Sequence, residues 1–226
     1  MNTDLISRAG ISRSGVALAG SDTAVATHHT IWRPALGLAA VMLVTCGLVY
    51  SASVTGLAGV LFSQQASGSL VMVDGKAVGS SLIAQPFSSD SYFHGRPSSV
   101  NTDPMSTGGS NLAPSNPALR DRVAAESAVL TERYQLSATE LPVDLLASSG
   151  SGVDPHISPE AAALQLKRVA AARGITTEML GKLVEQQTES PQWGIFGQPR
   201  VNVLLLNLAL DKHFPLKQSG GSASVQ

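Results

Sequence analysis

The chain has 226 residues, enough for one or two domains, and a formal net charge of −1. Only 14% of its residues are charged, against about 25% in a typical soluble protein, which favours a membrane segment. No cluster of Lys and Arg offers the basic face that nucleic-acid binding requires, so a nucleic-acid partner is excluded. The single cysteine, Cys46, rules out an intrachain disulfide, and its apolar surroundings favour an inert hydrophobic role over a reactive thiol.

The N-terminal third combines a polar tail with a long apolar run. Residues 1–33 are rich in Ser, Thr, Ala and Gly and show little hydrophobic periodicity, which predicts a disordered cytoplasmic tail. Pro34 to Phe62 contains no Asp, Glu, Lys or Arg, and about 20 apolar residues suffice for a helix to cross a bilayer. We predict a transmembrane helix over 34–58, with Trp32 and Arg33 as interface anchors and Pro34 in the first helical turn.

A cleaved signal peptide is the alternative for the same stretch. Arg33 would be its basic region and Ser51-Ala52-Ser53 its cleavage site. The apolar character continues past that site to Leu61 and Phe62, which favours an uncut anchor. Small residues four positions apart also offer a surface to a partner helix, although Gly and Ala are frequent in all membrane helices.

The flanking charges predict an orientation. Arg8, Arg13 and Arg33 precede the span, whereas only Lys76 lies within about twenty residues after it. The positive-inside rule therefore places the N-terminus in the cytoplasm and the larger C-terminal part outside. We predict a single-pass protein of the cell inner (cytoplasmic) membrane.

The rest of the chain predicts one small extracytoplasmic α+β domain over 63–215 and a flexible tail over 216–226. Segments 69–73 and 77–83 are typical of short strands. The sequence Asp74-Gly75-Lys76 between them is a hairpin turn signal.

A long loop follows, and then the first of three predicted helices. Residues 84–116 are rich in Ser, Gly, Pro and Asn and predict an ordered loop, whose length usually reflects function or packing against a partner. Asn116 is a helix-capping residue and Pro117 suits a first turn, so a helix is expected from there to about Tyr134.

Two further helices are expected towards the C-terminus. Ser158 and Pro159 begin one that Gly174 ends, and 177–187 forms the next. The dense apolar run 201–206 does not separate strand from helix, and we favour a buried strand that turns helical over 207–212.

Catalytic motifs are weak. A phosphate-binding loop fails because Ala77 follows Gly75-Lys76, and a nucleophile elbow fails because Leu112 follows Gly108-Gly109-Ser110-Asn111. The histidines show no paired metal-ligand spacing, so no metal site is predicted. Asp154 and His156 form only a weak pair.

Two clusters have candidate binding roles. The run Tyr92-Phe93-His94-Gly95-Arg96 combines aromatic rings, a titratable ring and a guanidinium, a composition typical of interface anchors. We predict a partner interface there and at Asp154 and His156, the alternative being that the aromatics fill the core and Arg96 binds carbonyls. Ser106 to Asn111 fits either an anion-binding nest of backbone N–H groups or a tight turn.

These motifs resemble the C subunit of the Kdp potassium-transporting ATPase (KdpC), over about residues 31–212. Their order and spacing agree with that family, while Ala84 stands where the family usually has Gly. The matching runs are Gly68–Leu70, Gly79-Ser80, Leu82-Ile83, Gln85, Tyr92–Ser98, Gly108–Leu112, Pro142–Asp144, Ser149–Gly152, Asp154–Pro159, Arg168–Ala170, Ala172–Gly174, Pro199–Leu204 and Leu206–Asp211.

The resemblance implies an accessory, non-catalytic subunit of an ATP-driven, high-affinity potassium uptake complex. The implied partners are a channel-like potassium-binding subunit, a P-type ATPase catalytic subunit and a small single-helix subunit. The family's C subunit is described as a chaperone that raises the catalytic subunit's affinity for ATP. ATP and potassium are handled by the complex, and no cofactor is expected on this chain alone. The family's proposed nucleotide-binding positions fall on Gln85, Gly108, Gly109, Ser110 and Asn111.

The predicted orientation conflicts with direct nucleotide contact, because it places the domain outside and ATP is inside. A structural role on the outer face of the potassium-conducting subunit is therefore favoured. Two alternatives remain: a membrane-anchored hydrolase using Ser110 or Ser151 with His94 or His156, and a free-standing binding module.

Overall fold

The computed structural model describes residues 28–216. Residues 1–27 of the disordered tail predicted over 1–33, and residues 217–226 of the flexible tail predicted over 216–226, lie outside these residues. Residues 28–33 are helical, which differs from the prediction. The chain divides into two compact units, 1–57 and 58–226, which are described separately.

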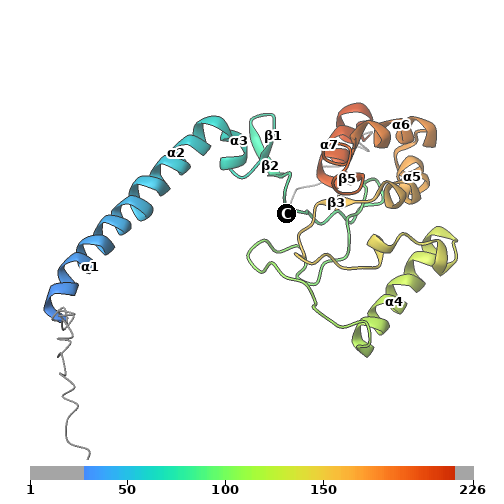
Figure 1. Cartoon of the computed structure of the whole chain (residues 1–226). Helices are drawn as coiled ribbons and strands as arrows, with labels where there is room; N and C mark the ends of the chain where they lie inside the picture. Colours follow the sequence, from blue (N-terminus) through green and yellow to red (C-terminus); the bar gives the residue numbers. More distant parts are fainter. Residues whose placement is uncertain (1–27, 217–226) are drawn as a thin grey trace, which may run out of the picture. The chain divides into compact units, whose positions relative to one another are not determined.

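One continuous helix begins the described chain. It comprises α1 (His28–Met42), the π-helical segment η1 (Leu43–Tyr50) and α2 (Ser51–Leu61) (Figure 1). Over Ile31–Leu61 it is long and apolar enough to cross a membrane. The helix begins six residues before the predicted start, so Pro34 lies inside α1 and the prediction that it occupies the first turn is wrong. The exposed Ile31 and Trp32 extend the apolar surface in that direction.

A β-hairpin follows the short helix α3 (Ser63–Ala66). Strands β1 (Leu70–Val73) and β2 (Lys76–Ser80) pair antiparallel, as the sequence predicted. Asp74 and Gly75 both have positive φ, as a two-residue type I′ turn requires. A bulge shifts the register between Val71 and Met72.

The predicted helices are confirmed as α4 (Pro117–Tyr134), α5 (Pro159–Arg173) and α6 (Thr177–Gln187). The side chains of Asn116, Ser158 and Thr176 each accept a hydrogen bond from a backbone N–H of the first turn, which satisfies a donor that the helix itself leaves unpaired. The short 3-10 segments η2 (Ala138–Glu140) and η3 (Val143–Leu145) lie between α4 and α5.

A small antiparallel sheet lies among the C-terminal helices. Its order is β3 (His156–Ile157), β5 (Arg200–Asn202) and β4 (Thr188–Glu189). The predicted strand over 201–206 is wrong beyond its second residue, because α7 (Val203–His213) begins at Val203. The Asn202 side chain accepts a hydrogen bond from the Leu205 N–H at 3.1 Å and so caps this helix earlier than the apolar pattern suggested.

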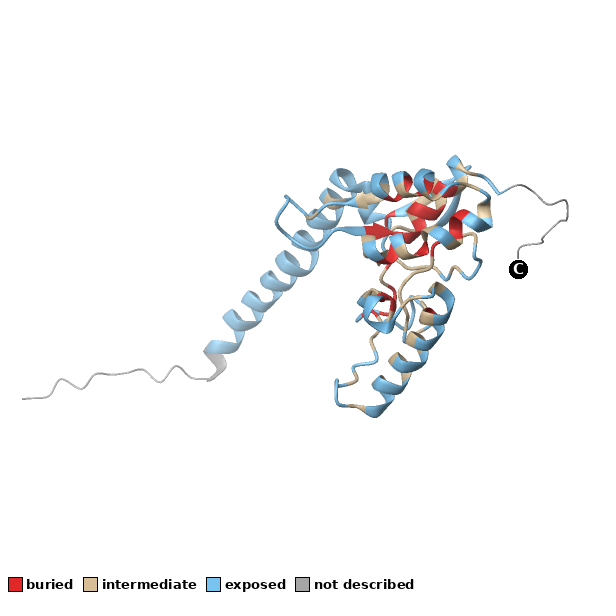
Figure 2. Ribbon diagram, turned by 90° about the vertical axis from the view of Figure 1, so that its right-hand side faces the viewer, coloured by how far each residue is buried: buried red, intermediate tan, exposed pale blue. Residues whose placement is uncertain are grey.

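The core forms where α5, α6 and α7 pack around this sheet (Figures 1 and 2). Residues 84–116 contain no helix or strand, as predicted, and the strand predicted over 77–83 already ends at Ser80. The domain is thus α+β, and its described core has the following fully buried large side chains: Phe93, Ile157, Gln165, Val169, Leu180, Val201, Leu206, Asn207 and Leu210.

Candidate functional site

Two buried amide side chains hold the segment 92–96 against the helices. The Asn207 amide of α7 accepts a hydrogen bond from the Phe93 N–H (2.9 Å) and donates one to the Phe93 carbonyl (3.0 Å). The Gln165 amide of α5 pairs in the same way with the N–H (2.7 Å) and carbonyl (3.0 Å) of His94. Each amide supplies the two hydrogen bonds that a neighbouring strand would otherwise make, so the extended loop is fixed without being part of a sheet.

Phe93 itself is completely buried. Its ring belongs to the core, which is the alternative that the sequence left open for the aromatics of this cluster. Its side chain therefore has no free surface to offer a partner, and the prediction that Phe93 is an interface anchor does not fit its position.

Tyr92 and Arg173 join the same segment to the C-terminus of α7. The Tyr92 hydroxyl donates a hydrogen bond to Asp211 (3.0 Å), while Arg173 binds the other oxygen of Asp211 at 2.7 Å and lies over the Tyr92 ring. Burial and the Asp211 carboxylate raise the pKa of Tyr92 above its usual value of 10. The phenol is therefore neutral and serves as a hydrogen-bond donor rather than as a base.

His94 points to its own loop. Its Nε2 lies 3.0 Å from the Ser89 carbonyl, which assigns the proton of the neutral ring to Nε2. Burial lowers the pKa of His94, and Arg168 and Arg133 lower it further against the opposing effect of the Ser89 carbonyl. His94 is thus a neutral structural donor near pH 7.

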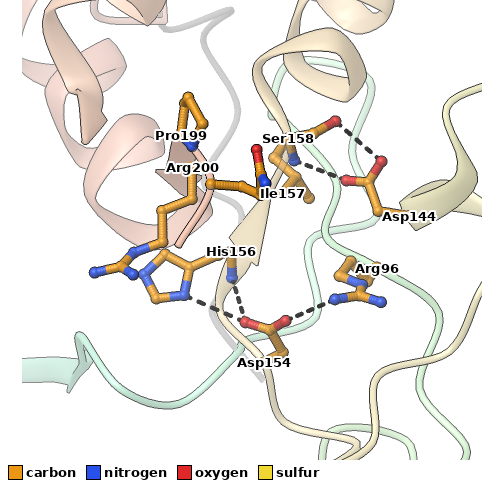
Figure 3. A pocket seen from close by; sticks show the side chains of 9 residues that line it. Arg96, Asp144, Asp154, His156, Ile157, Ser158, Pro199 and Arg200 are labelled. Carbon is orange, nitrogen blue, oxygen red and sulfur yellow. Dashed lines mark hydrogen bonds and ion pairs between the residues drawn. The ribbon is translucent and has the colours of Figure 1, made fainter. Parts of the chain in front are cut away.

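A groove of about 510 Å³ opens beside β3, where Arg96, Asp154 and His156 meet. Asp154 binds Arg96 Nη1 at 2.9 Å and the His156 Nδ1 at 3.2 Å, and it also accepts the His156 backbone N–H at 3.0 Å (Figure 3). The sequence expected only a weak pair at Asp154 and His156, and the structure adds Arg96 from 58 residues away.

The Asp154 carboxylate is held in its charged form. Burial alone would raise its pKa, but the hydrogen bonds from His156 and the charge of Arg96 outweigh burial, so the pKa of Asp154 lies below its usual value of 3.8. At neutral pH the groove therefore carries a carboxylate already matched by a guanidinium.

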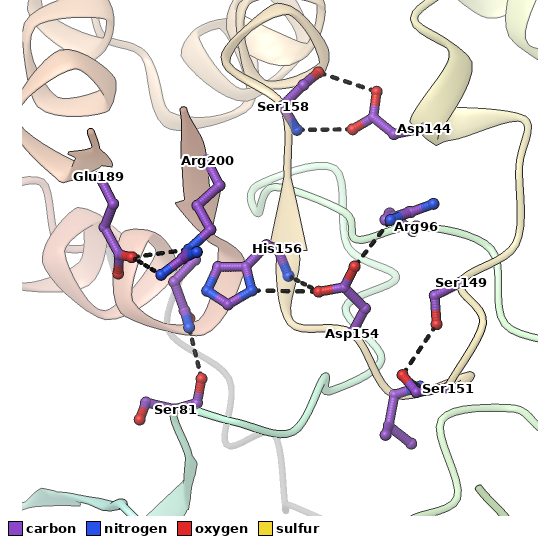
Figure 4. Close-up of polar contacts among 12 residues, drawn as sticks. Ser81, Arg96, Asp144, Ser149, Ser151, Asp154, His156, Ser158, Glu189 and Arg200 are labelled. Atoms are coloured by element: carbon purple, nitrogen blue, oxygen red, sulfur yellow. Dashed lines mark hydrogen bonds and ion pairs between the residues drawn. The ribbon is translucent and has the colours of Figure 1, made fainter. Parts of the chain in front are cut away.

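The opposite wall comes from the end of the β4–β5 hairpin. Arg200 lies beside the His156 ring and binds Glu189 across the two strands, at 2.8–2.9 Å (Figures 3 and 4). Asp144 also lines the groove, but its two oxygens accept the backbone N–H (2.7 Å) and hydroxyl (3.0 Å) of Ser158 at the start of α5. The groove is thus a polar surface in which most charges already have intrachain partners.

The glycine-rich loop over 106–111 packs against a second glycine-rich loop. The Gly108 N–H donates to the Ser151 carbonyl at 2.8 Å, and a side chain at Gly109 would lie 3.0 Å from the Gly150 carbonyl. The Ser106 N–H donates to Asp103 (3.2 Å). Two donors of the proposed anion nest are thereby used within the chain.

Gln85 is held elsewhere, on the β1–β2 hairpin. Its Nε2 donates to the Val78 carbonyl at 2.8 Å, and it covers Gly79, where an added side chain would displace it. The neighbouring Ala84 N–H donates to the Val153 carbonyl at 2.8 Å. The regions of Gln85 and Gly108 therefore both contact the segment between Ser151 and Val153.

Comparison with known proteins decides the family. The sequence model of KdpC, described as "K+-transporting ATPase, c chain", matches residues 32–212. A potassium-transporting ATPase KdpC subunit of Shewanella putrefaciens is 56% identical over 186 residues, or 82% of this chain and 92% of that relative. The corresponding subunit of Xanthomonas oryzae pv. oryzae is 52% identical, covering 80% and 86%, and that of Rhodopseudomonas palustris 49%, covering 79% and 95%.

The chain belongs to the KdpC family. The match includes both the apolar helix and the α+β domain, so the resemblance predicted from the short motifs is confirmed over most of the chain. Two of those motifs now have a structural reason in this KdpC-family domain, since Phe93 and Asn207 are both buried and hydrogen-bond to each other.

Sequence reasoning predicted Arg96, Asp154 and His156 but not the other residues that line the groove, among them Asp144, Gln198 and Arg200. Asp144 and Pro199–Leu204 were noticed as parts of KdpC family motifs, but no local pattern links positions so far apart. Among residues 28–216, no group of three His, Cys, Asp or Glu side chains is placed to hold a metal ion.

Proposed function

We propose that this chain is an accessory, non-catalytic subunit of an ATP-driven, high-affinity potassium uptake complex, anchored in the cell inner membrane by its N-terminal helix. The observation that carries the proposal is the family match, which runs through the helix and the domain together. The relatives are named as subunits of a potassium-transporting ATPase. The partners are a channel-like potassium-binding subunit, a P-type catalytic subunit and a small single-helix subunit.

The side chains that a hydrolase would need support a structural role instead. Within residues 28–216, no hydrogen bond joins Ser110 or Ser151 to either His94 or His156; the two rings contact Ser89 and Asp154. Ser151 instead lies 3.3 Å from the hydroxyl of Ser149. A nucleophile requires a base within about 2.6–3.2 Å, so this arrangement favours a domain that binds rather than reacts.

The same argument bears on ATP. Two of the family's proposed nucleotide positions are Gln85 and Gly108. The Gln85 side-chain amide donates a hydrogen bond to Val78, and the Gly108 N–H donates one to Ser151 of the same chain. The arginines before the helix favour a cytoplasmic N-terminus. Together, these observations support an extracytoplasmic domain without direct contact to ATP. Any effect on the catalytic subunit's affinity for ATP then passes through the membrane-embedded partners.

We expect the groove at Arg96 and Arg200 to face the potassium-binding subunit. Charged groups at the rim of an interface control recognition and the rate of association. Arg200 is half exposed (53%) and stands at the edge of the groove, so Arg200→Glu should reduce copurification of that subunit in mild detergent. The matched control is Arg120→Glu, which reverses an exposed charge on α4 and should leave copurification unchanged. Unchanged recovery with Arg200→Glu would remove the groove from the interface.

A second experiment tests the nucleotide role in the assembled complex. Gln85→Ala and Ser110→Ala should leave its affinity for ATP unchanged. A large loss of affinity from either substitution would support direct nucleotide contact and refute the structural role.

Topology is tested by labelling. In a Cys46→Ser background, a cysteine in place of the fully exposed Met105 should react with a membrane-impermeant maleimide added outside intact cells. Labelling only after permeabilisation would place the domain in the cytoplasm.

A further inference from the structure

The connection between β4 and β5 presents three apolar side chains to solvent. We call residues 190–199 the apolar arm. Trp193 is 83% exposed, Ile195 78% and Phe196 60%. The Trp193 and Phe196 rings pack edge to face with centroids 6.0 Å apart. Single exposed apolar residues are ordinary, but three within four positions on one turn form a surface that is typical of an interaction site.

The arm is a structured turn. Gln192 and Phe196 exchange two backbone hydrogen bonds, at 2.8 and 3.0 Å, and the Gly194 N–H donates to the Pro191 carbonyl at 2.9 Å. Trp193 has φ of 54°, a left-handed conformation that is a genuine outlier for a bulky residue. The turn therefore holds the apolar side chains outward at some conformational cost, instead of folding them onto the domain.

The arm carries no charge. None of the ten residues from Ser190 to Pro199 is Asp, Glu, Lys or Arg, and the charges at its base, Glu189 and Arg200, neutralise each other in an ion pair. Burying charged groups away from water is expensive, so an arm without them is suited to the apolar boundary of a lipid bilayer. Trp at such a tip is typical of membrane interfaces, since its ring is apolar and its N–H remains near polar headgroups.

The membrane is within reach. Residues 62–69, which include the short helix α3, separate the end of the membrane-spanning helix from β1 and span at most about 20 Å. A domain of about 150 residues has a radius of gyration of about 15 Å, so a domain on this tether stays close to the bilayer. Because the tether keeps the bilayer at high effective concentration, a small apolar surface is sufficient for contact.

We propose that the apolar arm inserts Trp193, Ile195 and Phe196 into the lipid interface of the membrane that anchors this chain. It thereby provides the domain with a second membrane contact, which fixes the face that the domain turns to the bilayer. The proposal rests on the anchor of the proposed function, but it requires neither potassium transport nor a particular side of the membrane.

The two tryptophans of the chain, Trp32 and Trp193, allow a direct test. The full-length Trp32→Phe variant is reconstituted into phosphatidylcholine vesicles with or without bromine on the upper acyl carbons. Interfacial segments lie about 5–10 Å deep, so the bromines should quench Trp193 emission about twofold. Adding Ile195→Ser and Phe196→Ser, both at exposed positions that leave the core intact, should abolish the quenching.

A matched control places the only tryptophan elsewhere on the domain. Trp32→Phe, Trp193→Phe, Met105→Trp has its single tryptophan at a fully exposed loop position and should be quenched by aqueous iodide and not by brominated lipid. Bromine quenching of Trp193 but not of the Met105→Trp ring supports the proposal. Iodide quenching of Trp193 without bromine quenching overturns it. Shielding of Trp193 that appears only when the other subunits are added, still without bromine quenching, also overturns it and assigns the arm to a protein partner.

Failure of the anchor gives a different result. In Trp193→Phe the remaining Trp32, at the end of the membrane helix, should itself be quenched by brominated lipid. If Trp32 is not quenched and alkaline carbonate extracts the chain from the vesicles, the membrane anchoring is refuted and the inference on the arm falls with it. Quenching of Trp32 without quenching of Trp193 refutes the arm alone.

Discussion

The Asn207 amide makes two hydrogen bonds to the Phe93 backbone, which we call the amide clamp. It gives the sharpest test of how the long loop is stabilised. Asn207→Leu keeps a side chain of similar size but removes both hydrogen bonds to the Phe93 backbone, at 2.9 and 3.0 Å. Phe93 is completely buried and Asn207 is 1% exposed, so water cannot replace the amide. Each buried group left unpaired costs about 1–3 kcal/mol, which gives a destabilisation of about 2–6 kcal/mol.

A loss of about 4 kcal/mol is a large fraction of the roughly 5–15 kcal/mol of a typical domain. For a domain of this size it lowers the thermal midpoint by about 8–16 °C. Circular dichroism of the full-length protein in mild detergent measures this shift. Gln186→Leu, which replaces an exposed amide on α6, should change the midpoint by no more than about 2 °C. If Asn207→Leu behaves like this control, the clamp is not what holds the loop.

Three further substitutions test other parts of the domain. Gly152→Ala should lower the free energy of unfolding, measured in urea, by about 2–4 kcal/mol, because Gly152 has φ of 73° and the new Cβ would lie 2.7 Å from the Gly108 carbonyl. In the control Gly150→Ala the new Cβ meets no atom within 4 Å, so the substitution should be tolerated. The pKa of His94 is lower in the folded protein than the value of about 6.5 in the unfolded chain, so the unfolded chain takes up the proton first and stability should fall as pH drops below about 6.5. Thermal midpoints between pH 8 and 5 should depend less on pH in His94→Gln, and an unchanged slope would contradict this assignment. Arg173→Lys should destabilise the domain by about 2–3 kcal/mol, because the buried guanidinium, 1% exposed, binds Ser91, Asp211 and Phe214 together and a lysine cannot reach all three. The control Arg120→Lys, on the surface of α4, should unfold like the parent protein.

The sequence predicted the elements whose determinants are local. Asn116 with Pro117 and Ser158 with Pro159 fixed two helix starts, and Asp74-Gly75 fixed the hairpin turn. The start of α7 was predicted four residues too late because residues 201–204 are all buried, so no amphipathic period marks the change from strand to helix. The two-residue strands β3 and β4 had no sequence signature, since their existence depends on β5 lying between them.

The candidate site was less predictable, for a related reason. Asp154 and His156 are neighbours in sequence and were paired correctly, but Arg96 joins them across 58 positions. The composition of 92–96 suggested surface anchors, yet Phe93 lies in the core and His94 serves its own loop. The apolar arm escaped notice because its residues are ordinary core types, and only the fold places them in solvent.

The reliance of the loop on α7 also has a consequence for biosynthesis. Ser81, Tyr92 and Phe93 find their hydrogen-bond partners in Asn202, Asp211 and Asn207, between 114 and 121 residues later. Such contacts form slowly, because a long stretch of chain must be closed before any of them is gained. While the ribosome is still making α7, the N-terminal apolar helix and the β1–β2 hairpin can already form, but residues 81–96 still lack the partners that Asn202 and α7 provide. The domain therefore completes its fold only after nearly the whole chain has been made, and until then its future core segment is exposed to chaperones and proteases.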